Sequence, residues 1–501
     1  MKGDRPSPMI TDREGKTMTL LDTTSGAKIA PAATHPATPA SPSAITRRVT
    51  LVVVCLATAM LMLDIAVVNT ALPTIARELG SGMGGLKWVV DGYTLALATI
   101  VLSAGVWSDR LGRKAVFVWG TVVFTIASLL CTMAGTMEVL IGARIVQGLG
   151  AALLFASSLA VLADAFDDLA ARAKALAIYG ATIGASFAIG PVVGGVLTET
   201  LDWRAIFAVN VPIGGVMLVA TRWVRESRSA NPRRGDWAGQ ILVIVALAGL
   251  AYGLIGANDR GWSDSVTVAA LAIAAAATAA FIVVERRVAE PMLPLSMFSN
   301  SSFAGGQVAT FAISASMFAL FVYTTIYLQG VLGMSAIEAG LVYVPGTAVM
   351  LVVAGATDQL VGRIPTWILL SVALVAVAVG LAAMTIGGVE GSGWAIAPGF
   401  ALSCIGAGIF NPVMSGLVLA ESHADDAGLA AGINDVFRQS GIALGVAALG
   451  AIFPAQSVLA GGSAVDFVSS LHVALWVGTG VALAGAAVCA LTMRGVVAAQ
   501  R

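Results

Sequence analysis

Apolar residues along this chain gather into long, nearly uninterrupted stretches that are separated by short polar segments. A helix needs about 20 apolar residues to cross the hydrocarbon core of a bilayer, and these stretches reach that length. The pattern predicts fourteen spanning helices, at about 50–72, 88–107, 115–135, 138–162, 176–197, 205–222, 238–256, 266–284, 303–325, 339–357, 366–386, 395–419, 430–453 and 471–493. The polar residues before them, rich in Pro, Ala, Ser and Thr, predict a disordered cytoplasmic tail over 1–46.

Composition agrees with this interpretation. Of the 501 residues, 58% are hydrophobic and 11% are charged, and too few polar side chains remain to coat a soluble protein of this size. The four cysteines lie in apolar stretches without metal-ligand spacing, and the three histidines are scattered. No nucleotide-binding loop is present, so ATP is not the direct energy source. We expect no cofactor, no metal and no nucleic acid as a partner.

The basic residues predict the orientation of the spans. If the N-terminus is cytoplasmic, the outer connections carry only Arg77, Lys87, Arg204 and Arg260, and the remaining basic connections all lie inside. Because a missed span would scramble this alternation, the bias predicts that both termini are cytoplasmic. We expect a multi-pass protein of the plasma membrane, and in a bacterium of the inner membrane.

The two ends of the chain echo each other. The connection after the second span, 105–114, reads GVWSDRLGRK, and 355–363 after the tenth span is a looser copy. This repeat predicts two six-helix bundles, over 47–225 and 291–501, with two inserted helices in 226–290. Duplicated bundles around a central cavity are a transporter architecture.

Small residues form a face on the fifth span. Gly180, Gly184, Pro191 and Gly195 follow one another at steps of four, seven and four, which places them along one side of a helix. A neighbouring helix can approach such a face closely and rock against it. The alternative is an ordinary packing seam of a membrane bundle.

Further motifs occur in register with the spans, at 63–73, 105–114, 140–148, 184–195, 203–214 and 438–445. On these residues the chain resembles the major facilitator superfamily, and within it the fourteen-helix drug/proton antiporter family. The resemblance implies an all-α polytopic fold of two six-helix bundles plus two inserted helices. It also identifies the fifth-span motif associated with antiporters, whose residues here are Gly184, Gly190, Pro191, Gly194 and Gly195.

Asp64 and Arg144 are the main candidates for proton coupling. A carboxylate inside a membrane span is costly, so a functional role is the first hypothesis for Asp64. At a rise of about 1.5 Å per residue, both side chains lie about 10 Å below the outer ends of their spans, so a contact is possible. Proton and cationic substrate would compete for this carboxylate. The alternatives are a structural acid at Asp64 and an arginine that is bonded to carbonyls or snorkels outward.

The connection after the second span is a candidate cytoplasmic gate. Gly112 allows a tight turn, and Asp109 can face a helix N-terminus or an arginine. Gly105, Arg110 and Arg113 belong to the same motif. The alternative is a basic anchor at the membrane surface.

Three other features leave alternatives open. Asp91 is either a second proton or cation site or a hydrated acid at a helix end. Asp435 and Arg438, spaced i, i+3, predict an internal ion pair. The tenth span has no acidic residue from 340 to 357, which argues against export of dications. The aromatic residues near span ends are expected to be interfacial anchors, namely Trp88, Tyr93, Trp107 and Trp119.

The sequence therefore predicts a secondary active exporter that expels a small amphipathic compound, neutral or monocationic, as protons enter, by alternating access and as a monomer. A dedicated exporter of an endogenous metabolite or self-made antibiotic is the alternative. A membrane enzyme lacks the clustered catalytic residues it would need, and a non-transporting sensor should have lost Asp64 and Arg144.

Overall fold

The computed structural model describes residues 43–499 except 167, 230–234, 358, 423–426 and 455. The predicted tail up to residue 42, and Asp358 in the second copy of the repeated loop, lie outside the described residues. The described residues form helices and no β-strand. The first helix already begins at Ala44, where the Ser43 side chain accepts a hydrogen bond from the Thr46 amide and so caps it.

Each of the fourteen predicted spans coincides with a helical segment. The segments are α1 (Ala44–Leu79), α2 (Met83–Leu111), α3 (Arg113–Thr132), α4 (Met137–Asp164), α5 (Leu169–Thr200), α6 (Ala205–Ala208), α7 (Asn210–Ala220), α8 (Trp237–Arg260), α9 (Ser265–Glu285), α10 (Ser301–Ile313), η3 (Ser314–Phe318), α11 (Ala319–Ile326), η4 (Tyr327–Val331), α12 (Ala336–Thr357), α13 (Thr366–Ala383), α14 (Ala397–Ala420), α15 (Ala427–Gly450) and α16 (Ala464–Ala499). Within the described ranges, thirteen helical stretches are long and apolar enough to cross a membrane. The remaining one, α15, carries Asp435 and Arg438 in its middle.

Two spans are less regular than the sequence predicts. The sixth is divided at Val209 into the short α6 and the longer α7. The ninth consists of α10 and α11 with π-helical turns at η3 and η4. π-Turns insert an extra residue and shift the face that a helix presents, and hydropathy windows do not detect such local changes.

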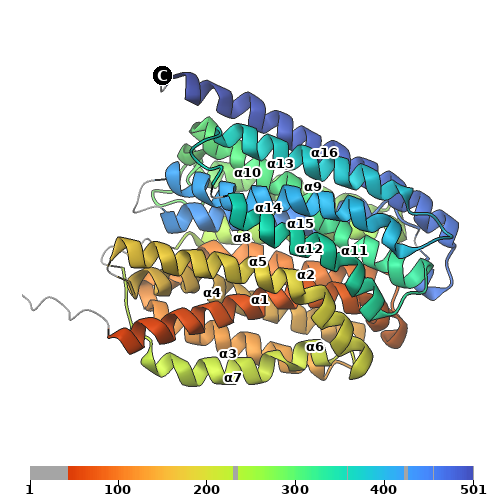
Figure 1. Cartoon of the computed structure of the whole chain (residues 1–501), viewed down its shortest axis with the longest axis horizontal. Coiled ribbons are helices and arrows are strands. Elements are labelled where there is room, and N and C mark those ends of the chain that lie inside the picture. Colours follow the sequence, from red (N-terminus) through yellow and green to blue (C-terminus); the bar gives the residue numbers. More distant parts are fainter. Residues whose placement is uncertain are drawn as a thin grey trace, which may run out of the picture. The chain divides into compact units, whose positions relative to one another are not determined.

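The helices pack as two groups, which we call the first group (α1–α7) and the second group (α10–α16). In the first group α4 packs on α2 and α3, and α1 packs on α5; in the second, α14 packs on α12 and α13, and α16 on α10 and α13. The groups meet mainly where α5 packs on α12 and α2 packs on α15, with smaller contacts of α1 with α11 and α12 and of α4 with α15 (Figure 1).

The inserted helices α8 and α9 pack on each other, and α8 also contacts α2 and α15. Gln240 of α8 donates its amide to the Thr99 carbonyl of α2 at 2.8 Å. Farther along, Ala251 of α8 packs with Leu95 of α2 and Ala443 of α15. The pair α8–α9 is therefore fastened beside the α2–α15 contact, where one helix comes from each group.

Glycines bring backbones together around α5. A methyl group added at Gly194 would lie 2.9 Å from the Val67 backbone of α1, and one added at Gly190 would lie closer still to the Ala66 side chain. On the other side, a methyl group at Gly195 would lie 2.5 Å from the Ala336 carbonyl of α12. Helix α5 is thus in backbone contact with one helix of its own group and one helix of the other.

The close backbone approach between α5 and α12 is limited to one end of the two helices. We call the two ends of the bundle the Gly80 end and the Gly112 end, after the glycines that follow α1 and α2. Gly195 lies toward the Gly80 end, whereas Gly184 meets only Leu351 at 3.7 Å, and a methyl group at Gly180 would meet nothing within 4 Å. The two helices therefore diverge toward the Gly112 end.

This geometry predicts different effects for two matched substitutions in α5. Gly195→Ala should lower the stability by about 1–3 kcal/mol, because the added methyl group must push α12 away. Gly180→Ala has the same change in helix propensity but enters open space, so it should leave the midpoint of thermal unfolding unchanged or slightly raised. Thermal unfolding of the purified variants in one detergent compares them, and equal midpoints would contradict the close contact.

Candidate functional site

A buried ion pair joins α1 to α4. Arg144 Nη1 lies 2.5 Å from Asp64 Oδ2, and the two side chains are 2% and 0% exposed. The sequence left this contact as a possibility, and the structure has it. Both residues lie well inside long apolar helices, where water does not reach the two charged groups.

Asp64 and Arg144 make further hydrogen bonds around the ion pair. Asp64 Oδ1 accepts from Gln147 Nε2 at 2.9 Å and from Asn210 Nδ2 at 3.2 Å. Arg144 donates to Gln147 Oε1 at 2.7 Å and to the Val89 carbonyl at 3.1 Å. The network therefore ties α1, α2, α4 and α7 together, and these hydrogen bonds offset part of the cost of removing the two charges from water.

Sequence reasoning did not assign Ser128 and Tyr93 to this site. Ser128 of α3 accepts from Gln147 Nε2 at 2.9 Å. The Arg144 guanidinium lies 4.2 Å from the centre of the Tyr93 ring, a cation–π contact. Tyr93 is buried, so the prediction of an interfacial anchor is wrong for it. Its position near a span end gave no indication of which face of α2 carries it.

The other aromatic residues near span ends behave differently. Trp119 is 65% exposed on α3, as expected for a side chain that faces lipid. Trp88 packs against Tyr252 of α8 with ring centres 6.3 Å apart, and Trp107 packs against Trp237 at 6.0 Å. These two tryptophans therefore hold the inserted helix α8 against α2.

Asp91 is enclosed in protein. Both of its carboxylate oxygens are buried and have no hydrogen-bond partner in the protein, so the side chain does not face bulk water at the helix end. One turn earlier, Lys87 Nζ donates to the Gly450 carbonyl of α15 at 2.8 Å. Tyr323 of α11 donates to the Val446 carbonyl of the same helix. A cation and a hydroxyl thus bind the C-terminal carbonyls of α15, where the helix dipole is negative.

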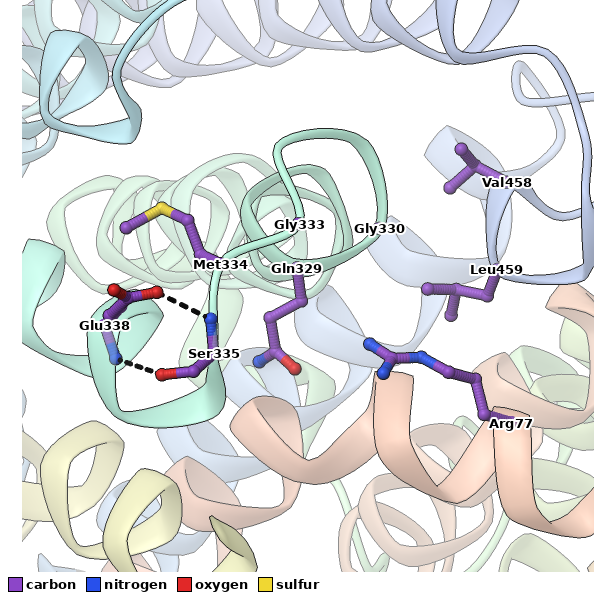
Figure 2. A pocket seen from close by; sticks show the side chains of 9 residues that line it. All are labelled: Arg77, Gln329, Gly330, Gly333, Met334, Ser335, Glu338, Val458 and Leu459. Atoms are coloured by element: carbon purple, nitrogen blue, oxygen red, sulfur yellow. Dashed lines mark hydrogen bonds between the residues drawn. The ribbon is translucent and has the colours of Figure 1, made fainter.

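The Lys87–Gly450 bond is one of three hydrogen bonds between described residues that join the two groups at the Gly80 end. Another runs from the Ile337 amide of α12 to the Glu199 carboxylate of α5, at 3.1 Å. The third is from Gln329 Nε2 of η4 to the Thr70 carbonyl of α1, at 2.8 Å. Beside it lies a cavity of about 460 Å³ (Figure 2). Arg77 enters this cavity from α1, and Glu338 lies across it, bonded to the Ser335 amide.

The connection between α2 and α3 is folded tightly. Gly112 has a backbone φ of 120°, a conformation that residues other than glycine rarely adopt. Asp109 faces an arginine of its own loop, Arg113, at 3.3 Å, and Arg113 also lies 3.7 Å from Asp164 of α4. Arg110 is exposed, and a methyl group at Gly105 would enter open space.

Glu226, after α7, was not predicted to take part in this loop. Its carboxylate accepts from the Lys114 and Ala115 amides at 3.1 and 3.2 Å, which places a negative charge at the N-terminus of α3. The Arg113 amide also donates to the Ser227 carbonyl at 2.9 Å. The sequence signal for this role of Glu226 was an acidic residue in an otherwise basic connection. These bonds fasten the loop between α2 and α3 to other parts of the first group and to the segment that follows α7.

The predicted ion pair between Asp435 and Arg438 is wrong. No contact within ion-pair distance joins them, and Asp435 Oδ2 has no hydrogen-bond partner. Arg438 Nη2 donates instead to Asn434 Oδ1, at 3.5 Å. Helical spacing permits an i, i+3 pair, but the neighbouring helix decides which acceptor the arginine takes.

The motifs, the two groups of helices and the buried ion pair agree with a comparison to known families. The profile of the Major Facilitator Superfamily matches residues 54–446. The chain belongs to the Major Facilitator Superfamily. This family consists of membrane transporters, not enzymes, and the predicted fold class is confirmed.

Named relatives cover most of this major facilitator chain. It is 33% identical to the "Methylenomycin A resistance protein" of Streptomyces coelicolor, over 83% of this chain and 88% of the relative. It is 34% identical to "Multidrug resistance protein Stp" of Mycobacterium tuberculosis, over 82% of this chain and 76% of that protein. The "Tetracenomycin C resistance and export protein" of Streptomyces glaucescens is 32% identical, over 81% and 76%. This major facilitator is thus a multi-pass bacterial membrane protein.

A solved structure supports the fold independently. The crystal structure of the human organic anion transporter MFSD10 (TETRAN) matches with a TM-score of 0.60, over 88% of this chain and 99% of that chain. The two sequences are 14% identical, so the match shows the fold alone.

The ion pair predicts strong coupling between two substitutions. Arg144→Gln leaves the Asp64 carboxylate buried without its charged partner, and should cost about 3–5 kcal/mol of stability. Asp64→Asn should also destabilise, because it leaves the guanidinium unpaired. The double variant removes both charges, so its loss of stability should be smaller than the sum of the losses in the two single variants. Thermal unfolding of the four proteins measures this coupling, and additive losses would show that the two charges do not interact.

Proposed function

We propose that this chain is a proton-coupled exporter of amphipathic organic compounds that works by alternating access. The observation that carries the proposal is the buried Asp64–Arg144 pair. An ionisable pair inside a membrane bundle is costly and is retained for a function such as proton transfer. No cofactor is needed for such a cycle, because the proton gradient supplies the energy.

The geometry supports a two-state role for Asp64. When ionised, Asp64 is held by Arg144, Gln147 and Asn210 and so binds α1 to α4 and α7. Protonation removes its charge and weakens this attachment, while Arg144 keeps the Val89 carbonyl and Gln147 as acceptors. Because α1 also contacts α5 and α11, a change in its attachment reaches the boundary with the second group.

In this proposal the bundles over 47–225 and 291–501 rock against each other, with 226–290 as two inserted helices. Close packing of Gly195 against α12 at one end and divergence at the other supports a rocking contact at the α5 motif, which also contains Gly184, Gly190, Pro191 and Gly194. Both termini lie in the cytoplasm, and the loop from Gly105 to Arg113 acts as a gate on that side. Asp91 is a second candidate for proton coupling.

The substrate class rests on the relatives. Two of them are named for resistance to methylenomycin A or to multiple drugs, and one for resistance to and export of tetracenomycin C. These names support export of small antibiotic molecules. We propose that the compounds are amphipathic and that the chain works as a monomer in the cell membrane. The names equally favour a second candidate, a dedicated exporter of one self-made antibiotic, because the methylenomycin A and tetracenomycin C proteins are each named for a single compound.

Efflux from inside-out vesicles tests the proposal. Vesicles with the wild-type chain should accumulate a fluorescent drug or labelled antibiotic when the interior is acid, and lose the accumulation when a protonophore is added. Asp64→Asn should abolish proton-driven accumulation, because the carboxamide cannot exchange a proton. Asp466→Asn, at an exposed position in the first turn of α16, is the matched control and should transport normally. Equal proton-driven transport by Asp64→Asn would refute the assignment, and accumulation of one compound from a broad panel would favour the dedicated exporter.

A further inference from the structure

Two carboxylates meet where the inserted helices α8 and α9 come together at the Gly112 end. Asp236 immediately precedes α8, and Glu285 is the last residue of α9; they are 9% and 3% exposed. One oxygen of each is bonded: Asp236 Oδ1 accepts from the Gly239 amide at 2.9 Å, and Glu285 Oε2 accepts from the Leu293 amide at 3.2 Å. The other two oxygens, Asp236 Oδ2 and Glu285 Oε1, are buried without a hydrogen-bond partner.

The two unbonded oxygens converge on the same place. A methyl group added at Gly239 would lie 2.5 Å from Asp236 Oδ2 and 2.9 Å from Glu285 Oε1, and the two carboxylates are within hydrogen-bonding reach of each other. Two carboxylate oxygens can bond to each other only when one of them carries a proton. No described cation lies within ion-pair distance of either acid, and Arg286 and Arg287, next in the chain, are exposed. Burial and the second negative charge therefore both favour a retained proton.

The pair lies where three parts of the chain are joined. Ser103 of α2 donates to Gln240 in the first turn of α8 and lies 3.9 Å from the sulfur of Met292, in the segment that leads from α9 to α10. Glu285 holds the same segment through its bond to the following amide. These neighbours from α2 and the segment are neutral, and the acid of the segment, Glu290, is exposed. The charge of the pair therefore acts on the attachment of the inserted helices and of the chain that enters the second group.

We infer that Asp236 and Glu285 form a proton-binding site that fastens the ends of α8 and α9 to each other and to the segment after α9, and that opens when the proton leaves to water. With one proton shared, the two carboxylates hydrogen-bond to each other. Without it, two negative charges face each other in a buried place and repel. The site lies apart from the Asp64 network and the α5 motif, so it goes beyond the proposed function and does not depend on it. A rise in pH at the Gly112 end should loosen this attachment.

Thermal unfolding of the purified full-length chain over a series of pH values tests the inference. The native pair holds a proton that the unfolded carboxylates release, so the wild type should lose stability as the pH rises from about 5 to about 8. Glu285→Gln puts an amide donor in place of the shared proton. Its unfolding midpoint should match the wild type at the acid pH and exceed it by about 2–4 °C at the alkaline pH, a gain that misfolding cannot produce. Asp466→Asn, at an exposed position, is the control and should keep the pH dependence of the wild type.

Hydrogen exchange tests the attachment itself. After correction for the intrinsic pH dependence of exchange, amides in the segment after α9 should lose protection at the alkaline pH in the wild type and keep it in Glu285→Gln. The inference is overturned if the two proteins lose stability in parallel, if the variant is the less stable one at the alkaline pH, or if the segment is equally protected in both. Stabilisation of the wild type alone by Mg²⁺ at the alkaline pH would also overturn it, because the site would then hold a metal ion and not a proton. None of these measurements requires transport, so a failure of the proposed exporter function would leave their outcome unchanged.

Discussion

The ion pair between Asp64 and Arg144 constrains the first group of helices more than any other contact. Each charge is buried among apolar helices, so each must be matched in position by the other and by neutral hydrogen-bonding groups. Gln147, Asn210 and the Val89 carbonyl meet this requirement only while α1, α2, α4 and α7 keep their places. A polar network of this kind sets the register of helices whose apolar surfaces would otherwise slide.

The boundary between the two groups is built from a different kind of contact. Close backbone approach at Gly195 and the bonds made by Lys87 and Gln329 are concentrated at the Gly80 end. Toward the Gly112 end, α5 and α12 separate. At the Gly80 end the two groups are held by close backbone packing and a few hydrogen bonds, so separating them there requires little free energy. Alternating access requires the groups to separate at the Gly80 end and to close at the Gly112 end.

Sequence reasoning found Asp64 and Arg144 because charged residues stand out against an apolar background and because their depths in two spans match. It placed Tyr93 at a lipid interface, since proximity to a span end does not reveal which face of the helix carries the residue. It paired Asp435 with Arg438 from spacing on one helix, whereas Asn434, held by α10, takes the arginine. Glu226 was missed because its partners are backbone amides of a distant loop.

Hydropathy, charge bias and ordered motifs were sufficient to determine a membrane protein with helices at fourteen places and membership of a transporter family. These properties depend on local composition, because lipid requires each spanning segment to satisfy its own backbone hydrogen bonds. Only the tertiary structure decided which buried charges are paired and which are left without a partner. That outcome depends on which faces of distant helices meet, and a span predicted from hydropathy alone carries no information about its rotation or its neighbours.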